Sequence, residues 1–123
     1  MDIIKINYPN GEMEIDRLYV IHNMPINDFK IFAKLFAMYN EQRERWEFIS
    51  ICEGVIKDYQ KEIGVLEEEK NTYQAKAEGS EYTVFSREYC KKVVSNVQKQ
   101  INGLNTKINR YQHKIDILKS YMC

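Results

Sequence analysis

Apolar residues in the last third of this 123-residue chain recur in alternating steps of four and three, and this spacing limits the possible folds more than any other feature. The positions are Cys90, Val94, Val97, Ile101, Leu104, Ile108, Tyr111, Ile115, Leu118 and Met122. Such a repeat is typical of a helix that packs along a second helix. A similar repeat runs from Ile49 to Tyr73, with Lys70 as its one charged position. The two repeats therefore predict two long helices packed side by side.

The breaks in the chain define where these helices begin and end. No proline occurs over residues 28–78, and Gly79 follows directly. Because glycine commonly ends a helix, we expect one long helix over 28–78 and a second over 82–123. Consecutive helices joined by a short loop pack antiparallel, so the pair forms a coiled-coil-like helical hairpin. The expected helix caps are Asn27 or Asp28 for the first helix and Ser80 or Ser86 for the second.

Residues 1–24 carry a different pattern, with a period of two. Ile4, Ile6 and Tyr8 alternate with polar residues, and alternation resumes after the turn sequence Pro9-Asn10-Gly11. This pattern predicts an N-terminal β-hairpin or small sheet. The apolar run Leu18–Ile21 is expected to be a third strand or a lead-in to the first helix. The fold class is therefore α+β, mainly α, in a single domain over residues 1–123.

The formal net charge is zero, from 18 basic and 18 acidic residues, but the charges are unevenly distributed. Residues 1–40 sum to −1, residues 41–82 to −5 and residues 83–123 to +6. The balanced total argues against binding of duplex nucleic acid, and the two charged segments are expected to pair across the helical hairpin. We expect no association with a membrane, because no apolar run is long enough to span one and no signal peptide precedes the hairpin.

The residues that commonly carry catalysis or hold metals do not form recognisable sets. The three cysteines are widely spaced, which argues against disulfides or a zinc site and favours a reducing cytoplasm. The sequence contains no glycine-rich phosphate loop and no nucleophile elbow. We therefore expect a protein that is not an enzyme, with no catalytic residues, no metal and no cofactor.

A second column of residues follows the face of the C-terminal helix opposite the apolar repeat. It begins with aromatic residues and continues with lysine, asparagine, glycine and arginine. The candidate ligand-binding residues on or beside it are Tyr82, Phe85, Arg87, Tyr89, Lys92, Asn96, Gly103 and Arg110. Aromatic rings can stack on a base, and cationic side chains can neutralise phosphate. The free N–H groups near Phe85 to Arg87 would add a preference for an anion, and Gly103 would allow close approach to the backbone.

The same aromatic residues also have a purely structural interpretation. Tyr82, Phe85 and Tyr89 could cover the loop end of the helical core or form an interface between subunits. The broad apolar arc Phe29–Tyr39, together with Trp46, needs more cover than a hairpin gives. We therefore expect a homo-oligomer, with a dimer as the minimum.

The order of elements, the segment Glu81–Tyr89, and Asn96 and Arg110 in the following helix resemble the first-described phage anti-Thoeris sponge family. Its members are small oligomeric proteins that sequester cyclic ADP-ribose isomers made by defence TIR enzymes. The resemblance matches Phe85, Asn96 and Arg110 to the family's pattern. It implies binding of a small anionic cyclic nucleotide between subunits, without cleavage, in the cytoplasm of an infected bacterial host cell. Some members also assemble beyond dimers and bind cyclic oligonucleotides at a separate site, which we assign to no residues here.

The resemblance also implies a role for each candidate residue. Stacking on Phe85 or Tyr82 would hold the adenine, and Asn96 would bond to a ribose or a base edge. The pyrophosphate would meet Arg87, Lys92 and Arg110. Two alternatives remain: a coiled-coil inhibitor or adaptor that binds another protein and no small molecule, and a nucleic-acid-associated coiled coil that uses the basic helix.

Overall fold

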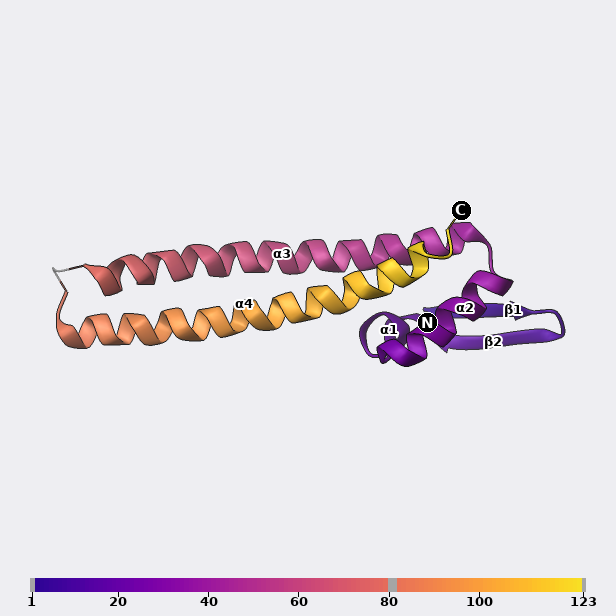
Figure 1. Ribbon diagram of the computed structural model, residues 1–123, viewed down its shortest axis with the longest axis horizontal. Coiled ribbons are helices and arrows are strands. Elements are labelled where there is room, and N and C mark those ends of the chain that lie inside the picture. The colour runs from indigo at the N-terminus through magenta and orange to yellow at the C-terminus, as the bar shows by residue number, and fades with distance from the viewer. Residues whose placement is uncertain (1, 80–81, 123) are drawn as a thin grey trace. The chain divides into compact units, whose positions relative to one another are not determined.

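The computed structural model of this chain describes residues 2–79 and 82–122 (Figure 1). Its elements, in chain order, are β1 (Ile3–Tyr8), β2 (Gly11–Asp16), α1 (Arg17–His22), α2 (Ile26–Tyr39), α3 (Gln42–Glu78) and α4 (Val84–Lys119). The two strands form an antiparallel sheet, and the long helices α3 and α4 pack against each other. The fold is therefore α+β and mainly α, as the sequence predicts.

The chain divides into two compact units. The first unit contains Met1–Ile56 and Asn109–Cys123, and the second contains Lys57–Ile108. The sheet, α1 and α2 thus belong to the first unit together with one end of α3 and one end of α4. The remainder of both long helices forms the second unit. The sequence pattern gives no sign of this division, because the apolar repeats run through it.

The predicted hairpin is present, with Ile4 paired to Ile15 and Ile6 to Met13. Its loop is Pro9-Asn10, and Gly11 opens β2 with a φ of 156°, in the region that favours glycine. Ile4 and Ile6 are buried on the face that packs against the helices. A two-stranded sheet is marginal alone, so this packing is what stabilises it.

The segment that follows the hairpin is the short helix α1, where the sequence led us to expect a third strand or a lead-in. Asp16 caps this helix, because its Oδ1 accepts a hydrogen bond from the Leu18 backbone N–H at 2.9 Å. At the other end, the Lys114 ammonium donates to the Val20 and Ile21 carbonyl oxygens. Both ends of α1 are therefore satisfied by side chains, one of them from far along the sequence.

The prediction of a single helix over residues 28–78 is wrong, since the structure has two helices there, α2 and α3. Asn40 leaves the helical region with φ −117° and ψ 159°. The guanidinium of Arg45 donates to the Ala37 and Asn40 carbonyl oxygens, and so satisfies the end of α2. Side-chain bonds thus hold a break that no proline or glycine marks in the sequence.

The predicted helix ends are only partly confirmed. Helix α2 begins at Ile26 after Pro25 with no side-chain cap, so neither Asn27 nor Asp28 has the expected role. Helix α3 ends at Glu78, and Gly79 follows as predicted. Ser80 lies outside the described residues.

The two apolar repeats lie along the seam of the long helices, where the first repeat is buried from Ile49 to Ile56 and half-buried from Tyr59 to Tyr73. In the second unit, Val97, Ile101 and Leu104 of α4 are buried. In the first unit, the buried residues include Ile115 and Leu118 of α4. The seam is not wholly apolar, because the Lys70 ammonium donates to Gln98 Oε1 across the helix pair at 3.0 Å.

Candidate functional site

The candidate site begins at the first turn of α4, and Thr83 caps that turn. Its Oγ1 accepts from the Ser86 N–H at 3.1 Å, and its carbonyl accepts from the Arg87 N–H at 3.0 Å. Ser86 is therefore not the cap that we expected. Of the N–H groups expected to attract an anion over Phe85 to Arg87, those of Ser86 and Arg87 are already bonded. The N–H groups of Val84 and Phe85 are the ones left at this helix end.

An exposed aromatic cluster, which we define as Phe85 and Tyr89, lies on this first part of α4. The side chain of Phe85 is 84% exposed and that of Tyr89 is 57% exposed. Exposing a phenylalanine so fully forfeits about 1.5–3 kcal/mol of burial free energy. Tyr82 differs, because its ring carbons lie 3.0 and 3.1 Å from the position that a Cβ on Gly79 would take. Tyr82 therefore packs against Gly79, whereas the aromatic cluster is open.

Several cationic side chains follow the aromatic cluster along α4. Arg87 is half-buried, and its Nε is buried without a hydrogen-bond acceptor among the described residues. Lys91 forms an ion pair with Glu88 at 3.2 Å. Lys92 and Lys99 are exposed, and neither has an ion pair within the described part of the chain. The expected pairing of α3 with α4 through opposite charges is also absent among residues 2–79 and 82–122, so these lysines keep their charge available.

The rest of the predicted column lies on the surface. Asn96 is exposed, and so is Gly103, where a Cβ would meet nothing within 4 Å. Arg110 is also exposed, but it belongs to the first unit, whereas the other predicted site residues belong to the second. The structure therefore places the aromatic cluster and Lys92 on one exposed face of α4, whereas the half-buried Arg87 lies on another face of the same helix. Ligand binding by these residues stays a prediction.

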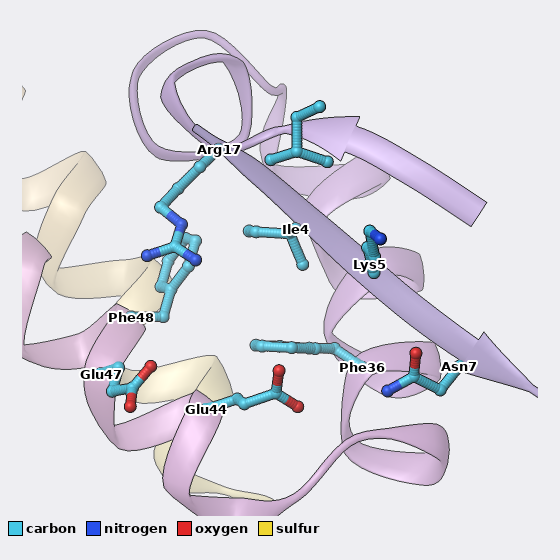
Figure 2. A pocket seen from close by; sticks show the side chains of 9 residues that line it. Ile4, Lys5, Asn7, Arg17, Phe36, Glu44, Glu47 and Phe48 are labelled. Carbon is cyan, nitrogen blue, oxygen red and sulfur yellow. The ribbon is translucent and has the colours of Figure 1, made fainter. Parts of the chain in front are cut away.

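A cavity of about 260 Å³ in the first unit escaped the sequence analysis (Figure 2). It is lined by Ile3, Ile4, Lys5, Asn7, Arg17, Phe36, Glu44, Glu47 and Phe48, and by none of the predicted site residues. Its walls come from β1, the first residue of α1, α2 and the start of α3. Alternation in the hairpin predicts a buried face but cannot predict that packing on this face leaves a space.

The first unit also buries a lysine and a cysteine that the sequence analysis did not single out as functional. Lys114 Nζ donates to the Val20 and Ile21 carbonyl oxygens at 2.8 and 2.9 Å, and lies 5.4 Å from the centre of the Phe29 ring. Burial lowers the pKa of Lys114 and raises the pKa of Cys52 to about 12. A thiol with such a pKa remains protonated and unreactive near neutrality, so this pair supports the fold rather than chemistry.

The described residues hold few other features of a reactive site. Among residues 2–79 and 82–122, no three His, Cys, Asp or Glu side chains lie close enough together to bind a metal ion. No helix within these ranges is both long and apolar enough to cross a membrane.

The fold and the site define a small protein of mainly α class, in which a hairpin and a helix pair accompany an exposed aromatic cluster. Comparison with models of known families, with curated proteins and with solved structures found no match. The function is therefore argued from the site alone.

Proposed function

We propose that this protein binds and sequesters a small anionic cyclic nucleotide of the cyclic ADP-ribose type, without cleaving it. The observation that carries the proposal is the nearly full exposure of Phe85 at the first turn of α4. An aromatic ring that contributes nothing to its own chain's core is available to stack on an adenine. The proposed setting is the cytoplasm of an infected bacterial cell, where TIR enzymes make such signals.

The surroundings of Phe85 suit a ligand that joins an aromatic base to phosphates. The N–H groups of Val84 and Phe85 stand at the positive end of α4. Arg87 and Lys92 lie within two turns of them and supply positive charge. Under this proposal the adenine stacks on the aromatic cluster, and the cations and N–H groups contact the pyrophosphate.

A second subunit completes the site under this proposal. The aromatic cluster is open in the single chain, so a ligand stacked there would keep one face in water. A partner subunit that covers this face would slow release of the ligand. Slow release and a stoichiometric supply of protein are what sequestration needs, in place of turnover.

The test is a thermal shift with cyclic ADP-ribose isomers as probes. Wild-type protein is expected to melt at a higher temperature in their presence, because a ligand that binds only the folded state stabilises it. Phe85→Ala removes the stacking surface and is expected to abolish the shift. Tyr19→Ala is the matched control, since Tyr19 is also an exposed aromatic but lies on α1.

Two outcomes would reject the proposal. The first is the absence of any shift with every isomer tested. The second is a shift that Phe85→Ala retains in full, because the ligand would then bind elsewhere. Chromatography of the released ligand decides the question of cleavage, and recovery of intact nucleotide is the expected result.

A coiled-coil adaptor that binds another protein is the second candidate, and one observation favours it. Val84 is exposed beside the aromatic cluster, which makes a continuous apolar surface of the kind found at protein interfaces. An adaptor would show no thermal shift with nucleotides, and a specific protein would co-purify with the wild type but not with Phe85→Glu.

A further inference from the structure

The Asn40 side chain occupies part of the edge of β1 that faces away from β2, and it bonds there as a neighbouring strand would. The Arg17 N–H donates to the Asp2 carbonyl at 3.0 Å and so continues the pairing of β1 with β2. Because backbone groups alternate in direction along an antiparallel strand, those of Ile3, Lys5 and Asn7 face away from β2. Asn40 Nδ2 donates to the Lys5 carbonyl at 2.6 Å, and Asn40 Oδ1 accepts from the Asn7 N–H at 3.2 Å.

The remainder of this edge has no partner. The Ile3 N–H and carbonyl and the Lys5 N–H have no hydrogen bond to any side chain or further strand among residues 2–79 and 82–122. The 260 Å³ cavity borders the same stretch, since both residues line it. Figure 2 shows Phe36 and Glu44 on the side of β1 to which the Ile4 side chain points. An exposed strand edge beside a cavity is the arrangement used by proteins that bind extended peptides.

The charges around the cavity leave one carboxylate uncompensated. Lys5 pairs with Glu12 and Glu14, Arg17 pairs with Asp2, and Glu47 pairs with Arg43. Glu44 is half-buried and has no ion pair within the described part of the chain. The cavity is therefore lined by one carboxylate without an ion pair, by apolar side chains, and by Lys5 and Arg17, whose charges are already paired.

We propose that the free edge of β1 and this cavity bind an extended segment of another protein that carries an arginine or a lysine. Its backbone bonds to Ile3 and Lys5 and extends the sheet by one short strand. Its cationic side chain enters the cavity, where the aliphatic stem contacts Phe36 and Phe48 and the charged group bonds to Glu44. The alternation of free N–H and carbonyl groups along the edge favours a peptide over a simple amine.

A second copy of this chain is a poor occupant of the same edge. In each copy the Asn40 carboxamide already bonds to Lys5 and Asn7, so only a short stretch of each β1 is available. Two such edges placed side by side would exclude each other's full pairing. A separate peptide has no carboxamide bonded along its own edge, so the Asn40 of this chain alone limits the pairing.

The test measures fluorescence anisotropy of a labelled pentapeptide, acetyl-Thr-Val-Arg-Val-Thr-amide, on the wild-type protein. Saturable binding is expected, and Glu44→Gln is expected to weaken it about tenfold, because the acceptor of the peptide's cationic group loses its negative charge. Glu62→Gln is the matched control, since Glu62 is exposed on the same helix without an ion pair among the described residues. Thermal melting verifies that both variants fold.

Two further probes separate strand addition from simple charge attraction. A peptide methylated on every amide nitrogen cannot donate hydrogen bonds along either of its edges, and we expect it not to bind. Amide hydrogen exchange at Lys5 is expected to slow when the unmethylated peptide is bound. Equal binding of both peptides, unchanged exchange at Lys5, or unchanged affinity in Glu44→Gln would each overturn the proposal. Self-association that the peptide disrupts would also overturn the proposal, since a second copy of this chain would then occupy the edge of β1.

Discussion

Lys114 and Cys52 show how the first unit uses buried polar groups. Lys114 is buried, yet its ammonium finds two carbonyl acceptors at the end of α1 and the face of the Phe29 ring. These carbonyls are among those that a helix leaves unsatisfied, so the lysine acts as a cap. Burial lowers the pKa of Lys114, and the nearby Arg110 lowers it further, whereas Cys52 opposes the change. The charge is thus retained against a desolvation cost by these specific partners.

Cys52 leads to a prediction about alkaline pH. In the unfolded chain its thiol ionises near its ordinary pKa of 9.0, whereas burial raises the folded-state pKa to about 12. The unfolded state therefore loses its proton first, and this contribution to stability is present below pH 9 and lost as the pH rises towards 12. The loss is at most about 1.4 kcal/mol per pH unit for one proton.

Urea unfolding of wild type and Cys52→Ala from about pH 8 to about pH 11 measures this effect. The lowered pKa of Lys114 acts in the opposite direction, because the folded state then releases its proton before the unfolded state does. The comparison with Cys52→Ala removes the titration of the thiol together with its effect on the pKa of Lys114. The wild type is expected to lose stability relative to the variant as pH rises, and parallel curves would contradict the assignment.

At the scale of elements, Asn40 joins three parts of the first unit. Its backbone ends α2, its carbonyl accepts from Arg45, and its carboxamide bonds to β1. The rings of Tyr8 and Tyr39 meet edge to face beside it, with centroids 4.9 Å apart. The sheet is therefore attached to the helices by polar bonds as well as by its apolar face.

Asn40→Ala tests this attachment. The variant loses both carboxamide bonds to β1, and we expect it to be less stable by about 2 kcal/mol. Amide exchange at Asn7 is expected to become faster, because this N–H loses its acceptor. Asn71→Ala is the control, since Asn71 is exposed on α3 and alanine favours helix there. Equal stability of the two variants would show that the carboxamide bonds contribute nothing.

The elements show which parts of the fold could be predicted from the sequence. Local signals were sufficient for the hairpin, for the buried repeats and for the end of α3 before Gly79. They failed at α1, because the distant Lys114 bonds to the end of this helix. They also failed at the break after α2, because the side chains of Arg45 and Asn40 stabilise it through bonds that local sequence does not indicate. The aromatic cluster is exposed, which agrees with its predicted position opposite the seam. Thr83 accepts hydrogen bonds from the Ser86 and Arg87 N–H groups, so fewer N–H groups are free at the start of α4 than we expected. The cavity had no sequence signal, since it depends on how β1, α1, α2 and α3 pack.

At the scale of the whole molecule, exposed apolar residues on α2 indicate a surface for association. The side chain of Ile31 is 64% exposed and that of Met38 is 59% exposed, and Leu35 between them is half-buried. These positions follow one face of α2, opposite the buried Phe32 and Phe36. An apolar stripe of this kind is typical of a surface that another subunit covers.

We therefore predict that the purified protein is a homo-oligomer. Light scattering is expected to give a mass that is a multiple of 14.7 kDa. Replacing Ile31 and Met38 together by lysine is expected to reduce the mass to that of one chain, because charge on both subunits would oppose contact. Exchange of the exposed Lys30 for alanine serves as a control. A monomeric wild type would contradict the prediction.

The bond from Lys114 to α1 also has a consequence for the order of events during protein synthesis. The Val20 and Ile21 carbonyls leave the ribosome long before residue 114 is translated, and the first unit as a whole draws on residues from Asn109 onward. The apolar surfaces of the nascent hairpin and α1 therefore stay incompletely covered until the residues from Asn109 onward are made. Exposed surfaces of this kind are the ones that chaperones bind, so the N-terminal region is where this chain most depends on protection while it is being made.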